Sequence, residues 1–184
     1  MYKRSFIMYD RGTKSLWVHV SGEAVRGERK GQKLKFLPSV IMQWGEWKLR
    51  NPLTTVLEGR AARGMMGHYG LKRDLKNYGL SVGEGKNVRL YRFSDLAKTP
   101  VINDSMPLGP IVVVYDKKTG VARAFMRGER TFNLKDGKLV DDKGAVADPF
   151  TGRGAELTLE SVPATVWLRN RWRAHFPKGE IYKP

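Results

Sequence analysis

A proline–tryptophan–proline pattern occurs twice in this chain, and the two occurrences are 125 residues apart. The matched residues are Pro38, Trp47 and Pro52 in the first half and Pro163, Trp172 and Pro177 in the second. Because proline is typical just before and just after a helix, the pattern predicts helices over about residues 40–50 and 165–175. Its recurrence indicates an imperfect internal duplication, whose copies share one core because a single small unit cannot bury its own apolar face.

Short apolar segments occur around the two helices, separated by glycine, aspartate and proline. Segments of this kind, rich in β-branched and aromatic residues, are typical of strands joined by tight turns. They are residues 6–9, 16–20, 34–37, 88–91, 111–115, 122–126 and 156–162. The continuous apolar run from Ile111 to Val114 predicts a central strand buried on both faces. The expected fold class is therefore α+β, mostly antiparallel β with two main helices and an imperfect internal duplication.

The duplication predicts an organisation into three segments. Residues 1–58 form a first, partial repeat, residues 59–85 a basic, glycine-rich connecting loop, and residues 86–184 a second repeat. Within the repeats, the strand unit of residues 10–37 is expected to correspond to residues 142–162. All three segments are expected to form one compact domain, because 184 residues are an ordinary domain length.

The composition limits the classes of partner and chemistry. The chain carries 34 Lys and Arg against 18 Asp and Glu, a formal net charge of +16, which favours polyanionic partners. It has no cysteine, which excludes disulfides, thiolate metal sites and a cysteine nucleophile. No segment is typical of a signal peptide or a transmembrane helix, so the chain is expected to be soluble, with the cytoplasm as its default location.

Several short motifs agree in order and spacing with one known family. They are Met8-Tyr9-Asp10, Ser15-Leu16-Trp17, Gly22-Glu23-Ala24-Val25, Leu37-Pro38 and Trp44 to Trp47, and later Ile102-Asn103-Asp104, Pro110 to Asp116 and Trp172 to Pro177. With these motifs the chain resembles the bacterial and archaeal domain-of-unknown-function 3179 family, which is uncharacterised and implies no activity.

The resemblance also implies a missing part. Longer members carry a Cys-Pro-x-Cys motif in an N-terminal portion, and this cysteine-free chain lacks that portion, so no thiol role carries over to it. The strand of the first copy at Met8-Tyr9-Asp10 is comparable to Val114-Tyr115-Asp116 in the second. The resemblance therefore implies an incompletely covered sheet, unless the fold is rearranged, a second copy or a partner chain pairs with the open edge, or a further N-terminal portion covers it.

Basic residues cluster in two places and predict a polyanion-binding surface. They are Arg26, Arg29, Lys30, Lys33 and Lys35 in a glycine-flanked hairpin, and Arg63, Lys72 and Arg73 in the glycine-rich loop. Cations interleaved with aromatic residues suit single-stranded nucleic acid, since phosphates pair with the cations and bases stack on the rings. The alternative is a solvated hairpin tip, and no recognised nucleic-acid-binding motif is present.

A second set of residues predicts a candidate cleft with carboxylates. Its members are Asp10, Trp17, Glu23, Asp104, Tyr115 and Asp116. Paired carboxylates perform acid–base chemistry where folding brings them together, while Asp10 and Asp116 are equally typical of turns that follow strands. The histidines are too widely spaced for a metal site, and no nucleotide-binding loop is present, so no metal or cofactor is expected. The tryptophans Trp44, Trp47, Trp167 and Trp172 are expected to pack in the core.

Three functional hypotheses remain open from the sequence. The favoured one is a noncatalytic binding or interaction module for polyanionic partners, with nucleic acid among them. The second, less favoured, is an enzyme with a cleft of carboxylates and arginines. The third is a remnant of a larger family member that functions only with a partner chain.

Overall fold

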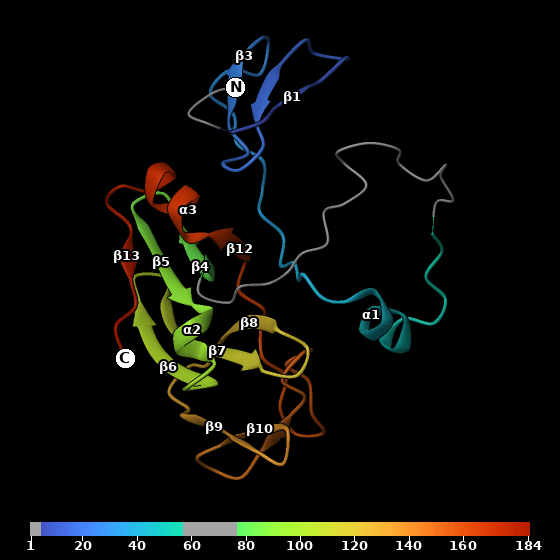
Figure 1. Ribbon diagram of the computed structural model, residues 1–184, viewed down its shortest axis with the longest axis vertical. Coiled ribbons are helices and arrows are strands. Elements are labelled where there is room, and N and C mark those ends of the chain that lie inside the picture. The colour runs from blue at the N-terminus through green and yellow to red at the C-terminus, as the bar shows by residue number, and fades with distance from the viewer. Residues whose placement is uncertain (1–4, 57–76) are drawn as a thin grey trace. The chain divides into compact units, whose positions relative to one another are not determined.

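The computed structural model describes residues 5–56 and 77–184, and the chain divides into two compact units, Met1–Leu37 and Pro38–Pro184 (Figure 1). Antiparallel sheets with three short helices make up the described structure, which confirms the predicted α+β, mainly β class. The boundary between the units follows residue 37, whereas the predicted first repeat extends to residue 58. The duplication itself remains a prediction.

Unit 1 contains a three-stranded antiparallel meander in the order β1-β2-β3. The strands are β1 (Ile7–Tyr9), β2 (Leu16–Val18) and β3 (Ala24–Arg26). Trp17, Val18 and Ala24 are the buried apolar side chains of this small unit. The predicted strand at residues 34–37 was wrong. Past the isolated bridge between Glu23 and Lys33, only the amide of Leu34 bonds back, to the carbonyl of Gly22 at 2.8 Å.

Unit 2 contains three sheets. The first, in the order β12-β4-β5-β13, consists of β4 (Tyr78–Glu84), β5 (Asn87–Arg92), β12 (Ala164–Leu168) and β13 (Glu180–Ile181). The second consists of β6 (Val101–Met106), β7 (Gly109–Asp116) and β8 (Val121–Met126). The third consists of β9 (Phe132–Lys135), β10 (Lys138–Asp141) and β11 (Val146–Ala147). Among the described strands, only β5 and β13 pair in parallel.

β7 lies at the centre of unit 2 because both of its faces are apolar. Ile111, Val113 and Tyr115 pack in the core that β7 shares with the four-stranded sheet. Val112 and Val114, which point the other way, pack with the sheet of β9, β10 and β11. The prediction of a strand buried on both faces is therefore confirmed, and unit 2 is built of successive sheet layers.

The helices begin later than predicted. α1 (Trp44–Arg50) begins four residues after residue 40, and α3 (Arg169–His175) begins at residue 169 because the preceding residues are β12, paired with β4. α3 covers the outer face of the four-stranded sheet, where Trp172 packs on β5. The sequence did not predict α2 (Phe93–Leu96), a single turn whose Phe93 and Leu96 are buried.

The predicted connecting loop of residues 59–85 was wrong at its C-terminal end, where residues 78–84 form β4. Leu80 and Val82 of this strand are fully buried. In the sequence, Gly79 resembles the glycines that are typical of loops and turns. In the structure, a Cβ at this position would lie 2.8 Å from the carbonyl oxygen of Tyr91, so the glycine permits close approach of two paired strands. Residues 59–76 lie outside the described part of the chain.

The predicted strand at residues 156–162 was also wrong. Leu157, Leu159 and Val162 are buried, yet only isolated bridges at Thr158 and Ser161 join this segment to its neighbours. Across residues 5–56 and 77–184, no helix has the length and apolar character that crossing a membrane requires.

Candidate functional site

A hollow of about 520 Å³ on unit 1 brings two sets of predicted site residues together. It is lined by Met8, Tyr9, Asp10, Trp17, Arg29, Gln32, Lys33, Leu34 and Lys35. Arg29, Lys33 and Lys35 belong to the predicted polyanion surface, and Asp10 and Trp17 to the predicted carboxylate cleft. The basic hairpin and the turn after β1 therefore form one concave surface.

The turn after β1 is fixed by the carboxylate of Asp10. Its oxygens accept hydrogen bonds from the amide of Gly12 at 2.9 Å and the hydroxyl of Thr13 at 2.5 Å. These bonds, chiefly the one from Thr13, lower the pKa of Asp10, and the guanidinium of Arg29 contributes further. Asp10 is thus an ionised turn residue whose lone pairs are largely occupied.

The tip of the basic hairpin is held against this turn. Gly27, at φ 91°, approaches so closely that a Cβ would lie 2.5 Å from the carbonyl oxygen of Lys14. The amide of Arg29 donates to the buried hydroxyl of Ser15 at 3.1 Å. Because the backbone of the tip is bonded to Ser15, just before β2, the cations it carries project from a defined surface and not from a free loop.

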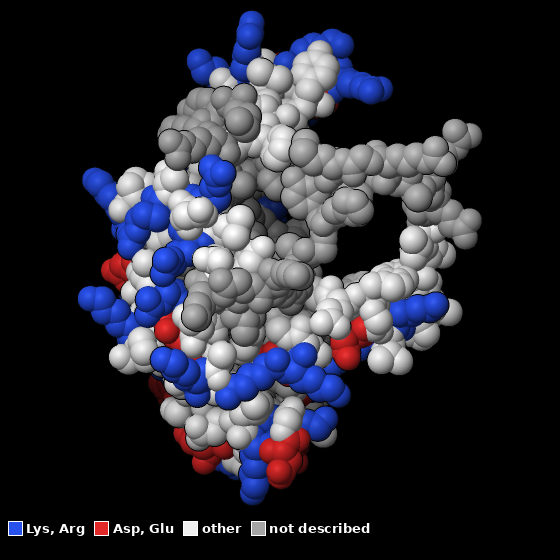
Figure 2. Space-filling model, in the orientation of Figure 1, with Lys and Arg blue, Asp and Glu red and all other residues white. Residues whose placement is uncertain are grey.

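Three of the hairpin cations form no ion pair with the described residues, although Arg29 lies close enough to Asp10 to lower the pKa of that carboxyl. Within residues 5–56 and 77–184, Arg29, Lys33 and Lys35 form no ion pair, and the one side-chain bond of Arg29 goes to the amide oxygen of Gln32 at 3.2 Å. All three side chains are exposed. Figure 2 shows Lys and Arg side chains projecting from unit 1, which carries nine of them against three Asp and Glu.

Two aromatic residues flank these cations. Tyr9 is 56% exposed, and the ammonium of Lys14 lies 6.0 Å from its ring centroid. Trp17 is 8% exposed and forms part of the wall and of the small core. An exposed ring beside unpaired cations suits a ligand that has both phosphates and flat bases.

The other predicted basic residues lie outside this hollow. Arg26 and Lys30 are exposed at the hairpin tip, and Glu23 bridges through its backbone to Lys33. Arg63, Lys72 and Arg73 lie outside the described residues.

The remaining members of the predicted cleft belong to unit 2, where each has a structural environment. Asp116 accepts from the amide of Lys118 at 2.8 Å and the hydroxyl of Thr119 at 2.6 Å, as a turn residue. Tyr115 is 1% exposed within the main core. Asp104 is engaged by two neighbours that the sequence analysis did not single out, Arg89 and Tyr91.

Asp104 lies at the centre of a polar network on β5, β6 and β13. Its Oδ2 accepts from the Arg89 guanidinium at 2.6 Å and the Tyr91 hydroxyl at 2.5 Å, and Arg89 also pairs with Glu180 at 2.6 Å. Burial raises the pKa of Asp104, but the hydrogen bonds from Tyr91 and Arg89 outweigh it and the net shift is downward. The signal for Arg89 and Tyr91 was present, since they alternate with apolar residues in the predicted strand at 88–91.

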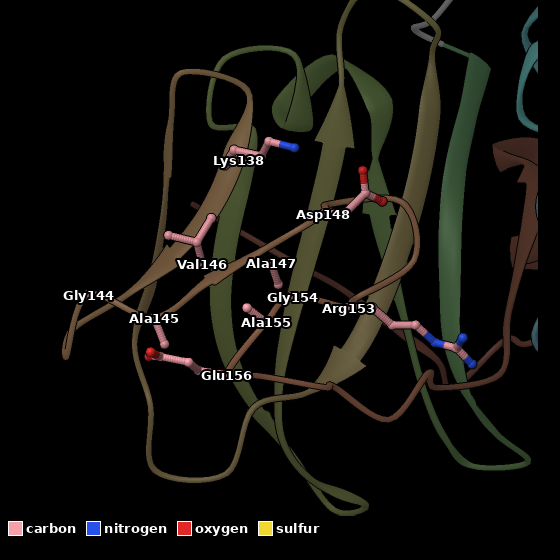
Figure 3. A pocket seen from close by; sticks show the side chains of 10 residues that line it. All are labelled: Lys138, Gly144, Ala145, Val146, Ala147, Asp148, Arg153, Gly154, Ala155 and Glu156. Carbon is pink, nitrogen blue, oxygen red and sulfur yellow. The ribbon is translucent and has the colours of Figure 1, made fainter.

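A second hollow, of about 440 Å³, lies beside β11 (Figure 3). Its floor consists of glycine and alanine, and in Figure 3 the Arg153 side chain points away from those alanines. The carboxylate of Asp148 already accepts from the amides of Phe150 and Thr151, at 3.0 and 2.7 Å. This hollow offers few convergent polar groups. No group of three or more His, Asp or Glu in the described part of the chain has the arrangement of a metal site.

Comparison with known proteins confirms the resemblance found in the sequence. Residues 1–79 match the model of the family described as "Protein of unknown function (DUF3179)". The resemblance predicted for the later motifs, from Ile102 to Pro177, lies beyond that match and remains a prediction. No curated protein matches the chain. No solved structure matches it.

Proposed function

We propose that unit 1 is a noncatalytic binding module for a polyanion, with single-stranded nucleic acid as the form its surface fits best. The observation that carries this proposal is the hollow where Arg29, Lys33 and Lys35 line one surface with Tyr9 and form no ion pair among the described residues, while Asp10 in the same hollow accepts hydrogen bonds from Gly12 and Thr13. Unpaired surface cations gain more from a phosphate than cations already held in ion pairs, because no existing pair must be broken.

The charge distribution supports placing this function on unit 1. Its nine basic and three acidic residues leave a surplus in a segment of 37 residues. On the visible face of unit 2 both signs appear, with Asp and Glu gathered near the β9–β10 end (Figure 2). A polyanion drawn by the overall charge of +16 would therefore concentrate at the basic hairpin.

The exposed Tyr9 ring supports nucleic acid over a featureless polyanion. Base stacking on an aromatic side chain contributes about 1–3 kcal/mol per base. A sulfated polysaccharide has no flat base and gains only the ionic part. The proposal thus predicts that the chain binds nucleic acid more tightly than a polyanion of equal charge that has no bases.

The test is fluorescence anisotropy of labelled single-stranded and duplex oligonucleotides with the whole chain over a salt series. Each phosphate contact on a single strand contributes about 0.7 to the slope of log K against log salt. Replacing both Lys33 and Lys35 by alanine is expected to lower that slope by about 1.4. The matched control replaces Lys117 and Lys118, two exposed lysines in the turn after β7, and so removes the same charge.

Two further measurements decide between nucleic acid and charge alone. Tyr9→Leu is expected to weaken single-strand binding about fivefold or more while leaving the salt slope unchanged. Heparin, in equal charge concentration, is expected to compete poorly. Complete displacement by heparin, or equal losses in the hairpin and control double variants, would refute a nucleic-acid site on unit 1.

A further inference from the structure

β1 and its turn in unit 1 have the same local structure as β7 and its turn in unit 2, 106 residues later. The pair Ile7–Val18 between β1 and β2 corresponds to Val113–Ala124 between β7 and β8, and Met8–Trp17 and Tyr9–Leu16 follow in the same register. In each case an aspartate after the strand accepts from a threonine hydroxyl three residues on: Asp10 from Thr13, and Asp116 from Thr119.

The backbone conformations agree at the same spacing. Lys14 and Gly120 both have positive φ, 53° and 70°, and so do Gly22 and Gly128, at 61° and 58°. A positive φ at a lysine is uncommon, so its match to a glycine 106 residues later is informative. This spacing aligns residue 10 with residue 116, as the comparison of Met8-Tyr9-Asp10 with Val114-Tyr115-Asp116 predicts, and differs from the spacing that matches residues 10–37 to residues 142–162.

The two strands differ in what lies on their outer edge. β7 carries β6 there, paired over six residues from Val101–Val114 to Met106–Gly109. Among the residues that the structure describes, β1 pairs with β2 alone. The side chains on one face of the two strands differ as well: Phe6 is 77% and Met8 42% exposed, while their counterparts Val112 and Val114 are buried because the sheet of β9, β10 and β11 packs on that face of β7.

The outer edge of β1, which no described strand pairs at Ile7 to Tyr9, has a defined hydrogen-bonding pattern. The amide of Asp10 donates to the carbonyl of Ser15 at 2.9 Å, and the carbonyl of Phe6 accepts from the amide of His19 at 3.0 Å, so both bonds go to residues that flank β2. Because the bonded residues of an antiparallel pair alternate, Ile7 and Tyr9 direct their N–H and C=O groups to the outer edge. At the matching position on β7, the amide of Tyr115 donates outward to the carbonyl of Pro100 at 2.8 Å.

We propose that the outer edge of β1 binds an extended, antiparallel strand from another polypeptide, in the register that β6 adopts on β7. In that register, the counterpart of Ile102 lies opposite Ile7, and the counterpart of Pro100 lies opposite Tyr9. The partner strand therefore carries apolar side chains at alternate positions. The surplus of basic residues in unit 1 favours acidic flanks on that strand.

This inference is independent of the nucleic-acid proposal, because it rests on backbone groups of β1 and not on the hairpin cations. Strand addition draws its affinity from main-chain hydrogen bonds and its specificity from alternate side chains. The β6 sequence itself is the natural probe, since the structure gives its register on the equivalent strand.

The probe is a labelled synthetic peptide of residues 99–107, titrated with the whole chain. Saturable binding is expected, together with amide chemical-shift changes at Ile7 and Tyr9. In the β6–β7 pair the amide of Ile102 faces β7 and that of Asn103 faces away, by the same alternation. A peptide N-methylated at Ile102 is expected to bind about tenfold more weakly, and one N-methylated at Asn103 nearly as well as the parent.

Variants of the chain test the same edge from the other side. Ile7→Pro removes an outward N–H that β2 does not use, so it is expected to abolish peptide binding and keep the fold. Ile7→Lys keeps the backbone donor and adds a charge at the edge. It is expected to weaken peptide binding as well, and it tests the same edge if Ile7→Pro does not fold. Neither variant should weaken nucleic-acid binding, since Ile7→Pro removes no cation and Ile7→Lys adds one.

Three results would overturn the inference. The first is no saturable binding of the peptide, and the second is binding that both N-methylated peptides retain equally. The third is a concentration-dependent dimer, measured by light scattering, that disappears in Ile7→Pro, which would assign the edge to a second copy of this chain and not to a separate partner.

Discussion

The hydroxyl of Tyr91, on β5, donates a 2.5 Å hydrogen bond to Asp104 on β6, in the neighbouring sheet. Tyr91 is 1% exposed, and the Asp104 side chain is 13% exposed. The same carboxylate oxygen accepts from Arg89, which also holds Glu180 on β13. One carboxylate thus joins two layers of unit 2 and, through Arg89, the last strand. A carboxylate that is engaged in this way by several hydrogen bonds is typical of a structural residue.

The network predicts how stability depends on pH. Because the pKa of Asp104 is lowered in the folded state, its contribution is present above the unfolded pKa of about 3.9 and is lost as the pH falls through the folded value. We expect the free energy of unfolding of the wild-type chain to decline below about pH 5. Asp104→Asn is expected to flatten that decline and to lower stability at pH 7, since the Arg89 guanidinium loses its buried partner.

Urea unfolding followed by circular dichroism from pH 3 to pH 7 measures this effect. Asp136→Asn is the matched control, because Asp136 is exposed in a turn at φ 48°, which asparagine tolerates. An identical pH profile for wild type and Asp104→Asn would show that the network does not contribute to acid sensitivity.

The two helices predict losses of stability of different size when their matched tryptophans are replaced. Trp172 of α3 is fully buried against Val88 and Leu90, and its indole donates to the hydroxyl of Ser81 at 2.8 Å. Trp172→Ala is expected to destabilise unit 2 by about 3–5 kcal/mol. Trp47 occupies the same position in α1, which has no buried residue, so Trp47→Ala is expected to cost less than about 1 kcal/mol. Denaturation midpoints compare the two variants directly, and similar losses would contradict this assignment.

Ser81→Ala refines that prediction. It leaves the Trp172 indole N–H buried without an acceptor, which costs about 1–3 kcal/mol. A smaller loss than for Trp172→Ala is expected, with the same fluorescence spectrum in the folded state. A loss near zero would mean that the hydrogen bond to Ser81 adds nothing to the packing of the ring.

The same tryptophans show what the sequence could and could not predict. Proline and tryptophan spacing predicted both helices, because those signals are local to the chain. It predicted core packing for four tryptophans, of which Trp172 is fully buried while Trp44 is 50% exposed. Helical periodicity identifies an apolar face, but burial depends on whether another element packs against that face. For Trp172 that element is β5, whose Val88 and Leu90 lie more than 80 residues earlier in the chain.

The candidate site was predicted only in its parts. The basic hairpin was visible as a cluster of charges, and Asp10 as a turn residue after a strand, both from local sequence. Their union in one hollow depends on Gly27 and on the Arg29–Ser15 hydrogen bond, which spans 14 residues. β4 was missed for a related reason, since its glycines are typical of loops and only the neighbouring strand explains Gly79.

Gly27 supplies the last prediction, which links the fold of unit 1 to its proposed function. At φ 91°, with a Cβ that would lie 2.5 Å from the backbone of Lys14 and Ser15, Gly27→Ala both strains its own backbone and separates the hairpin tip from the turn. Gly31 has a similar φ of 87°, but its Cβ would meet nothing within 4 Å. Gly31→Ala is therefore expected to lower stability only through its positive φ, by about 1 kcal/mol. We expect Gly27→Ala to reduce oligonucleotide affinity and to increase hydrogen exchange at the amide of Arg29, while Gly31→Ala largely retains both. Equal affinity in the two variants would show that the basic hairpin acts without being held against the turn, and would reduce the hollow to a collection of independent surface charges.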